Sequence, residues 1–187
     1  MGCCLVLAVV TVTAASALVL SADRAGAQEG APPCSSGETP RVARYKVEKG
    51  EILPASIKEP LNGKRGNPEK GVEWMADRRQ GNCISCHTVS RILERVKEGD
   101  HESEMKYGSH GTIAPPLDGV ADRYSEAELR MIVVDAKQAF PDLDTSMPAY
   151  HRKDGFNRVL GDCKGLAILS ASRVEDIVAF LKTLKEE

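Results

Sequence analysis

Residues 77–87 read Asp-Arg-Arg-Gln-Gly-Asn-Cys-Ile-Ser-Cys-His, and the last five of them decide the fold. Cys83 and Cys86 are three residues apart, so on one helical turn their thiols point to the same side. His87 follows directly. Two thiols and an imidazole in this order are the pattern of c-type haem attachment, in which the cysteines bind the porphyrin and the histidine binds the iron.

Two other uses of a C-x-x-C pair fit this sequence less well. A structural zinc site needs a second pair of ligands at suitable spacing, which the sequence does not offer. A thioredoxin-like redox site needs a βαβ context, and strand patterns are weak throughout. The C-x-x-C-H motif occurs once, so we expect one covalent haem c.

The N-terminus has the composition of an export signal. Residues 4–20 carry no charge, and the small-residue triplet Ala25-Gly26-Ala27 follows them. This order predicts a signal peptide over 1–27, a periplasmic protein and no membrane span after processing. The apolar run is at the short end for crossing a bilayer, but an uncleaved anchor stays an alternative.

The charge balance argues against one class of partner. The 187 residues include 25 Lys and Arg against 27 Asp and Glu, which gives a formal net charge of -2. A chain without excess positive charge binds nucleic-acid phosphates poorly. We therefore expect no nucleic-acid partner, and electrostatic docking only through local patches.

The cysteine count raises the question of a disulfide. Of six cysteines, Cys3 and Cys4 belong to the expected signal peptide and two to the haem motif, which leaves Cys34 and Cys163. Cysteines of exported proteins are usually bonded. The sequence leaves open whether these two form a disulfide or remain free thiols.

Helical patterns predict an all-α protein with long loops. We divide the chain into a signal peptide (1–27), an irregular N-terminal extension (28–70) with one short strand at 42–47, and a helical domain (71–187). Helices are expected from Pro68 through Met75, over 90–96, from the capping box Ser125/Glu128 to Gln138, and from a second capping box at Ser172/Glu175 to Leu184. Loops are expected over 98–111 and 141–165.

The second axial ligand of the iron should come from a downstream loop. The candidates are Met105, Met131, Met147, His101, His110 and His151. Met147 precedes Pro148 in a long irregular segment, which can wrap over a haem face and present a thioether. We predict Met147 as the sixth ligand and keep His151 as the alternative. Protein ligands on both faces leave the iron no open site, which favours electron transfer.

Four blocks of sequence, in their order, resemble the SoxX family of class I cytochromes c. They are 77–87, 115–124, 146–150 and 177–184, spread over about residues 71–187. The resemblance implies a class I cytochrome c-like fold, with haem attached at Cys83 and Cys86, His87 as proximal ligand and Met147 as distal ligand. It also implies that Pro116 and Leu117 pack against the haem and orient His87 through a backbone carbonyl.

The resemblance further implies a place in a thiosulfate-oxidising complex. SoxX cytochromes pair with a SoxA-like cytochrome, whose haem carries the catalysis, and the complex couples thiosulfate to a cysteine of a SoxYZ-like carrier. This chain would accept the electrons and pass them to a small acceptor cytochrome, without catalytic residues of its own. Two alternatives are a free periplasmic class I cytochrome c shuttle and a non-enzymatic haem-sensing module. A shuttle usually has a ring of lysines, whereas the residues around Met147 are of mixed charge.

Overall fold

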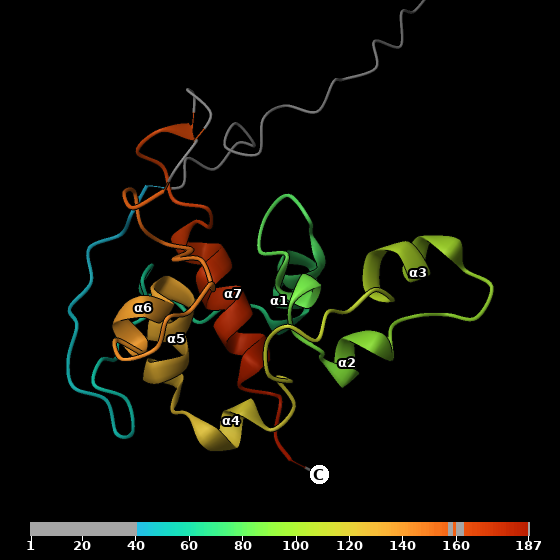
Figure 1. Cartoon of the computed structure of the whole chain (residues 1–187), viewed down its shortest axis with the longest axis horizontal. Coiled ribbons are helices and arrows are strands. Elements are labelled where there is room, and N and C mark those ends of the chain that lie inside the picture. Colours follow the sequence, from blue (N-terminus) through green and yellow to red (C-terminus); the bar gives the residue numbers. More distant parts are fainter. Residues whose placement is uncertain (1–40, 157–158, 160–162, 187) are drawn as a thin grey trace, which may run out of the picture.

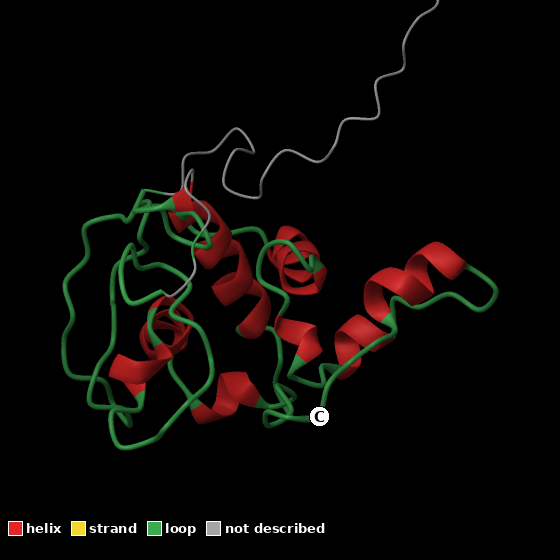
Figure 2. Cartoon of the chain, turned by 45° about the horizontal axis from the view of Figure 1, so that its top comes forward, coloured by secondary structure: helices red, strands yellow, loops and turns green. Residues whose placement is uncertain are grey.

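The computed structural model describes residues 41–156, 159 and 163–186. Within these residues all the regular elements are helices, as predicted (Figures 1 and 2). They are α1 (Pro68–Ala76), the 3-10 turn η1 (Cys83–Ser85), α2 (Ser90–Leu93), α3 (His101–Tyr107), α4 (Val120–Arg123), α5 (Glu126–Val134), α6 (Ala136–Ala139) and α7 (Ala171–Leu181). No helix in this part of the chain is long and apolar enough to span a bilayer.

Helix α7 is the centre of the molecule, and α1 crosses it in direct backbone contact (Figure 1). Pro68 occupies the first turn of α1, as predicted, and the Asn67 side chain caps it. A Cβ atom at Gly71 would lie 2.2 Å from the carbonyl oxygen of Asp176 on α7, so only glycine permits this approach. The Trp74 indole donates to the Asp176 carboxylate at 3.0 Å and fixes the crossing further.

The helix expected over residues 126–138 is two helices. The capping box of Ser125 and Glu128 opens α5 as predicted. The backbone of Asp135 is extended (φ -157°, ψ 91°), which ends α5 at Val134. The Asp135 side chain then accepts a hydrogen bond from the Lys137 N–H and begins α6.

The capping box expected for the last helix is wrong. Ser170, and not Ser172, is the N-cap of α7, and its hydroxyl accepts from the Arg173 N–H. Glu175, the expected partner in the box, is buried against Arg130. Glu175 lies five positions after this N-cap rather than the three that a capping box requires, and it stabilises the core instead.

Residues 41–67, which we call the N-terminal strap, run around the outside of α5 and α7 (Figure 1). The expected strand at 42–47 is absent from the strap; its one bridge joins Glu48 to Ser56. Leu53, Ala55, Ile57 and Leu61 are buried in the same core as the helices. The strap is irregular because its backbone N–H groups bond to buried side chains rather than to a neighbouring strand.

Two buried carboxylates and one buried arginine hold the strap. Glu128 accepts from the N–H groups of Ile52 and Leu53 at 2.6 and 2.7 Å. Arg130, 1% exposed, forms a forked ion pair with Glu175. Arg130 also donates to the Ile57 carbonyl (2.8 Å) and to Glu126 (2.8 Å), and Glu175 accepts from the Leu61 N–H (2.9 Å). Satisfied on every side, these charges tolerate burial.

The segment expected as a loop over 98–111 contains α3. The sequence of α3, HESEMKY, lacks a clear apolar stripe, so periodicity does not reveal it. Its start is marked by Asp100, whose carboxylate caps the N–H groups of Glu102 and Ser103. With α2, which ends at Leu93, it forms an arm that stands off from the rest of the protein (Figures 1 and 2).

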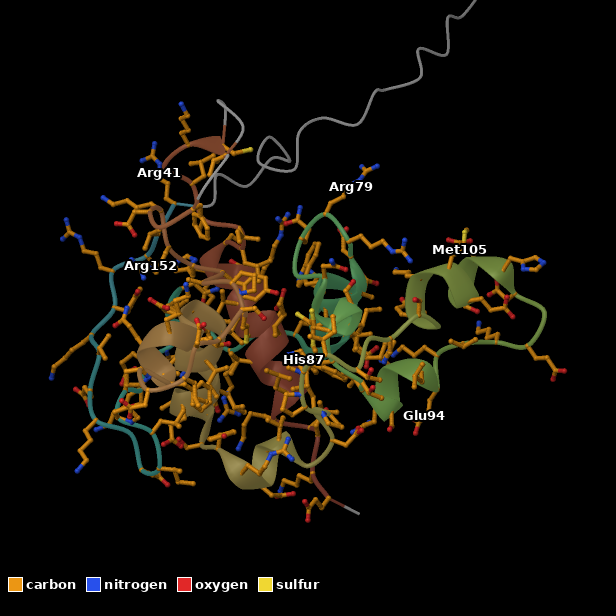
Figure 3. The ribbon with its side chains drawn as sticks, viewed as in Figure 1. Arg41, Arg79, His87, Glu94, Met105 and Arg152 are labelled. Atoms are coloured by element: carbon orange, nitrogen blue, oxygen red, sulfur yellow. The ribbon has the colours of Figure 1, made fainter. Side chains whose placement is uncertain are left out.

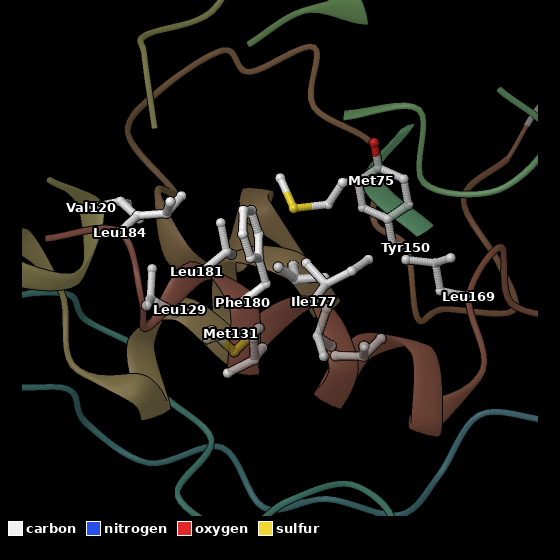
Figure 4. Packing of buried hydrophobic residues seen from close by; sticks show 14 of the residues in the cluster. Met75, Val120, Leu129, Met131, Tyr150, Leu169, Ile177, Phe180, Leu181 and Leu184 are labelled. Atoms are coloured by element: carbon white, nitrogen blue, oxygen red, sulfur yellow. The ribbon is translucent and has the colours of Figure 1, made fainter. Parts of the chain in front are cut away.

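The hydrophobic core lies along α7 and extends toward residue 150 (Figure 4). Ile177 and Phe180 of α7 pack with Met75 of α1 and Met131 of α5, all at most 4% exposed. Tyr150 lies at one end of this cluster, with its ring among the apolar side chains and its hydroxyl directed toward the segment around residue 83. The core therefore reaches the C-x-x-C-H turn directly.

Candidate functional site

The five residues of the motif form one compact turn. The N–H groups of Cys86 and His87 both bond to the Cys83 carbonyl, at 3.1 and 3.0 Å. Asn82 precedes the turn in the left-handed conformation (φ 50°), which asparagine adopts more readily than most residues. The Ser85 hydroxyl donates to the Asn82 side-chain oxygen at 2.5 Å. The two cysteines and the histidine thus come from a single turn, as the spacing predicts.

Both motif cysteines are free thiols in different surroundings. Cys86 is exposed, whereas Cys83 is half-buried. Burial raises the pKa of the Cys83 thiol to about 12, although the Tyr150 hydroxyl donates to its sulfur and acts in the opposite direction. Cys83 is therefore a neutral thiol at pH 7, held by a tyrosine that sequence reasoning did not single out.

The His87 ring is oriented by a backbone carbonyl. Its Nδ1 lies 2.7 Å from the Pro115 carbonyl oxygen, which can only accept, so Nδ1 carries the proton. Nε2 is left with its lone pair, the form in which a histidine binds a metal. We expected this carbonyl at Pro116 or Leu117, which is wrong: the Pro116 carbonyl accepts from Arg123 at 3.0 Å instead.

Residues 111–117 lie against the motif as a second backbone layer. A Cβ atom at Gly111 would lie 2.0 Å from the Ser85 carbonyl oxygen, so the two backbones touch. Three N–H groups bond across this contact: Gly111 to the Ile84 carbonyl (2.8 Å), Ala114 to that of Cys86 (3.0 Å) and Leu117 to that of Thr88 (3.0 Å). This ladder places the Pro115 carbonyl beside His87.

Met147 and Leu117 are both half-buried against the hydrophobic core, and Pro116 is exposed. The Met147 N–H donates to the Thr145 hydroxyl at 3.1 Å, which fixes the start of its loop. Met131 is fully buried in the core, and Met105 is 72% exposed on α3. Of the three methionines, Met147 alone combines a loop position with partial burial, so iron ligation by Met147 remains our prediction.

His151, the alternative axial ligand, has no nitrogen available. It is fully buried. Its Nδ1 lies 2.8 Å from the Leu169 carbonyl oxygen, and its Nε2 accepts from the Ala43 N–H at 2.9 Å. Both ring nitrogens therefore serve to tie the N-terminal strap to two C-terminal loops.

This arrangement predicts a pH dependence of folding. Burial lowers the pKa of His151 below 6.5, and a protonated ring cannot accept the Ala43 N–H. Because the folded-state pKa is depressed, the stabilisation is complete above pH 6.5 and is lost as pH falls through the folded pKa. We expect the free energy of unfolding to fall between pH 7.5 and 5, measured by chemical denaturation. His151→Gln should lose about 1–3 kcal/mol at pH 7.5 and flatten this slope.

A second histidine provides the control. Burial also lowers the pKa of His110, so His110→Gln measures its separate share of the slope. An unchanged slope in His151→Gln would contradict the prediction.

The residues present fit a covalently bound haem. The free thiols of Cys83 and Cys86 can form two thioether bonds, and the Nε2 of His87 carries an available lone pair. Figure 3 labels His87 near the middle of the molecule in that view. In the described part of the chain no three His, Cys, Asp or Glu residues are grouped to hold a metal ion.

Comparison with known proteins agrees with this site. The family model for cytochrome c matches residues 68–185. A chain in the crystal structure of SoxXA from P. pantotrophus is 43% identical, with a TM-score of 0.56; the match covers 70% of this chain and 90% of that one. Among curated proteins there is no match.

The match to the cytochrome c family covers the C-x-x-C-H motif, residues 111–117 that bond to it, and helices α1 to α7. It therefore includes the whole described site and the helices around it. The similarity to a SoxXA chain extends over nearly all of that chain. The chain therefore belongs to the cytochrome c family as a SoxX-like member of class I fold, with covalently bound haem c as its cofactor.

Proposed function

We propose that this protein is the electron-accepting, monohaem subunit of a SoxAX-type complex that oxidatively couples thiosulfate to a cysteine of a carrier protein. The observation that carries the proposal is the 43% identity to a SoxXA chain over 90% of its length. The sequence left a free cytochrome c shuttle as the alternative function. At this identity and coverage, assembly with a SoxA-like partner is favoured over that alternative. Catalysis belongs to the partner subunit.

In this proposal each site residue has one role. Cys83 and Cys86 attach the haem, His87 is the proximal ligand and Met147 the distal one, while Pro116 and Leu117 lie against the ring. The haem supplies one-electron transfer. The Pro115 carbonyl keeps the His87 proton on Nδ1, and the ladder of residues 111–117 holds that carbonyl in place. The protein's own contribution is thus orientation of the proximal ligand.

The proposed partners are a SoxA-like cytochrome, a SoxYZ-like carrier that is reached through it, and a small acceptor cytochrome. The proposed location is the periplasm. Cys163 is disulfide-bonded, which supports an oxidising compartment. Cys34, its possible partner, and the predicted signal peptide over 1–27 lie outside the described residues.

The proposal is tested by capture of tagged mature protein from the periplasm, followed by haem staining and mass measurement. We expect a second haem protein of SoxA type to co-elute at a ratio of about one to one, since the similar chain comes from a SoxXA structure. The variant His87→Ala with the same tag is the control: any protein that it also captures binds to misfolded protein and not to the native cytochrome. Recovery of this cytochrome alone would contradict the proposal and favour a free shuttle.

A further inference from the structure

A small cavity of about 160 Å³ opens between α3 and the turn that carries the motif cysteines. It lies outside the set of residues assigned to haem binding. Of the nine described residues that line it, none carries a carboxylate, whereas Arg78 and Lys106 are both cationic. A cavity of this volume has room for more than one water molecule and accommodates a small oxoanion.

The cations at this cavity are not neutralised by the protein. Neither Arg78 nor Lys106 forms an ion pair in the described part of the chain. The contact of Lys106 is with the Tyr107 ring, 5.1 Å from its centroid. Tyr107, and more weakly Glu73 and Glu102, raise the pKa of Lys106, yet none of the three lines the cavity. Lys106 hydrogen-bonds with Tyr107, and no carboxylate among the lining residues pairs with either cation inside the cavity.

The neutral groups of the cavity are also donors. Asn82 uses its side-chain oxygen to accept from Ser85, which leaves its amide N–H groups available. The Nδ1 of His110 accepts from the Val89 N–H at 3.1 Å, so its Nε2 carries the proton. That Nε2 is buried and meets no acceptor at hydrogen-bond geometry, although the Tyr107 backbone is close enough to act on the pKa of His110. A buried, unpaired N–H is costly, and an acceptor in the cavity would satisfy it.

We infer that this cavity is a binding site for a small oxoanion, held by Arg78, Lys106, Asn82 and His110. The proposal does not depend on the assembly proposed above. Convergent cationic and neutral donors without a carboxylate are the chemistry that recognises sulfate-like ions. Because Asn82 and Ser85 belong to the motif turn, a bound anion adds negative charge directly beside the haem attachment.

The test is a calorimetric titration of the haem-loaded protein with sodium sulfate, against sodium chloride at equal ionic strength. We expect saturable sulfate binding. Arg78→Gln should weaken the affinity about tenfold or more, because it removes one charge-assisted hydrogen bond to the anion. Arg79→Gln is the matched control, because Arg79 is at the tip of its loop, directed into solvent, and does not line the cavity (Figure 3). Its affinity should stay within about twofold.

Two further readouts make the result decisive. Sulfate should shift the His110 ring resonances of the reduced protein in the wild type and in Arg79→Gln, and leave them unshifted in Arg78→Gln. It should also lower the reduction potential in the same two proteins. If Arg78→Gln and Arg79→Gln weakened sulfate binding equally, the binding would depend only on the overall surface charge, and the proposed site would be wrong. Equally tight binding of acetate would overturn its assignment to a multivalent oxoanion.

Discussion

Met147→Leu is expected to abolish the weak near-infrared band that arises from charge transfer between a methionine sulfur and ferric haem iron. Leucine has nearly the volume of methionine, so the half-buried position beside the core should stay filled. The thioether is the one feature removed, and with it the proposed sixth ligand. The measurement is the near-infrared absorption spectrum of the oxidised protein, together with its reduction potential, which should fall.

Met105→Leu is the matched control, because this methionine is 72% exposed on α3. Its spectrum should equal that of the wild type. A band that survives in Met147→Leu would remove Met147 as ligand. Since both nitrogens of His151 are bonded to backbone groups, the search would then turn to Met105 and the arm that carries it.

The largest expected loss of stability follows from Arg130→Met. This change leaves Glu175 buried, 2% exposed, with the Leu61 N–H as its remaining donor. An uncompensated buried charge costs about 3–5 kcal/mol of unfolding free energy. The Ile57 carbonyl loses its donor as well. Urea denaturation at pH 7.5, followed by circular dichroism, measures the difference.

Two variants separate charge from packing. Glu126→Gln weakens an ion pair whose carboxylate is 40% exposed, and should cost less than about 1 kcal/mol. The double variant Arg130→Met with Glu175→Leu removes both buried charges, and should recover at least half of the single loss. A cost below about 1 kcal/mol for Arg130→Met would show that water reaches Glu175 and would contradict the assigned burial.

The sequence predicts those helix starts that depend on neighbouring residues, and it misses those that depend on distant partners. Pro68 marks a helix start through its fixed φ and missing N–H, and the Ser125/Glu128 box does so through short-range hydrogen bonds; both are confirmed. Ser172 fits the same pattern, but Glu175 gains more from Arg130, which is distant in sequence, than from a cap. Likewise α3 depends on the Asp100 cap rather than on an apolar stripe. Tertiary pairing overrides a local signal wherever a buried charge needs a partner.

The candidate site divides in the same way. The single turn with Cys83, Cys86 and His87 follows from their spacing alone. The Pro115 carbonyl and the Tyr150 hydroxyl do not, because each reaches the motif from a loop more than twenty residues away. No pattern of residue types announces a backbone carbonyl as the partner of a histidine. Gly111 is the nearest to a signal, since a glycine often marks close approach of two backbones.

The way the N-terminal strap is bonded determines the minimum folding unit. The match to the cytochrome c family begins at residue 68, yet Glu128, Arg130, Glu175 and His151 each have at least one hydrogen-bond partner upstream, between Ala43 and Leu61. A shortened chain that starts at Pro68 would keep every helix and every residue of the motif while exposing three ionised side chains and an apolar groove. Such a fragment would bind haem without forming a stable protein, so the autonomous folding unit includes the strap from Ala43 onward.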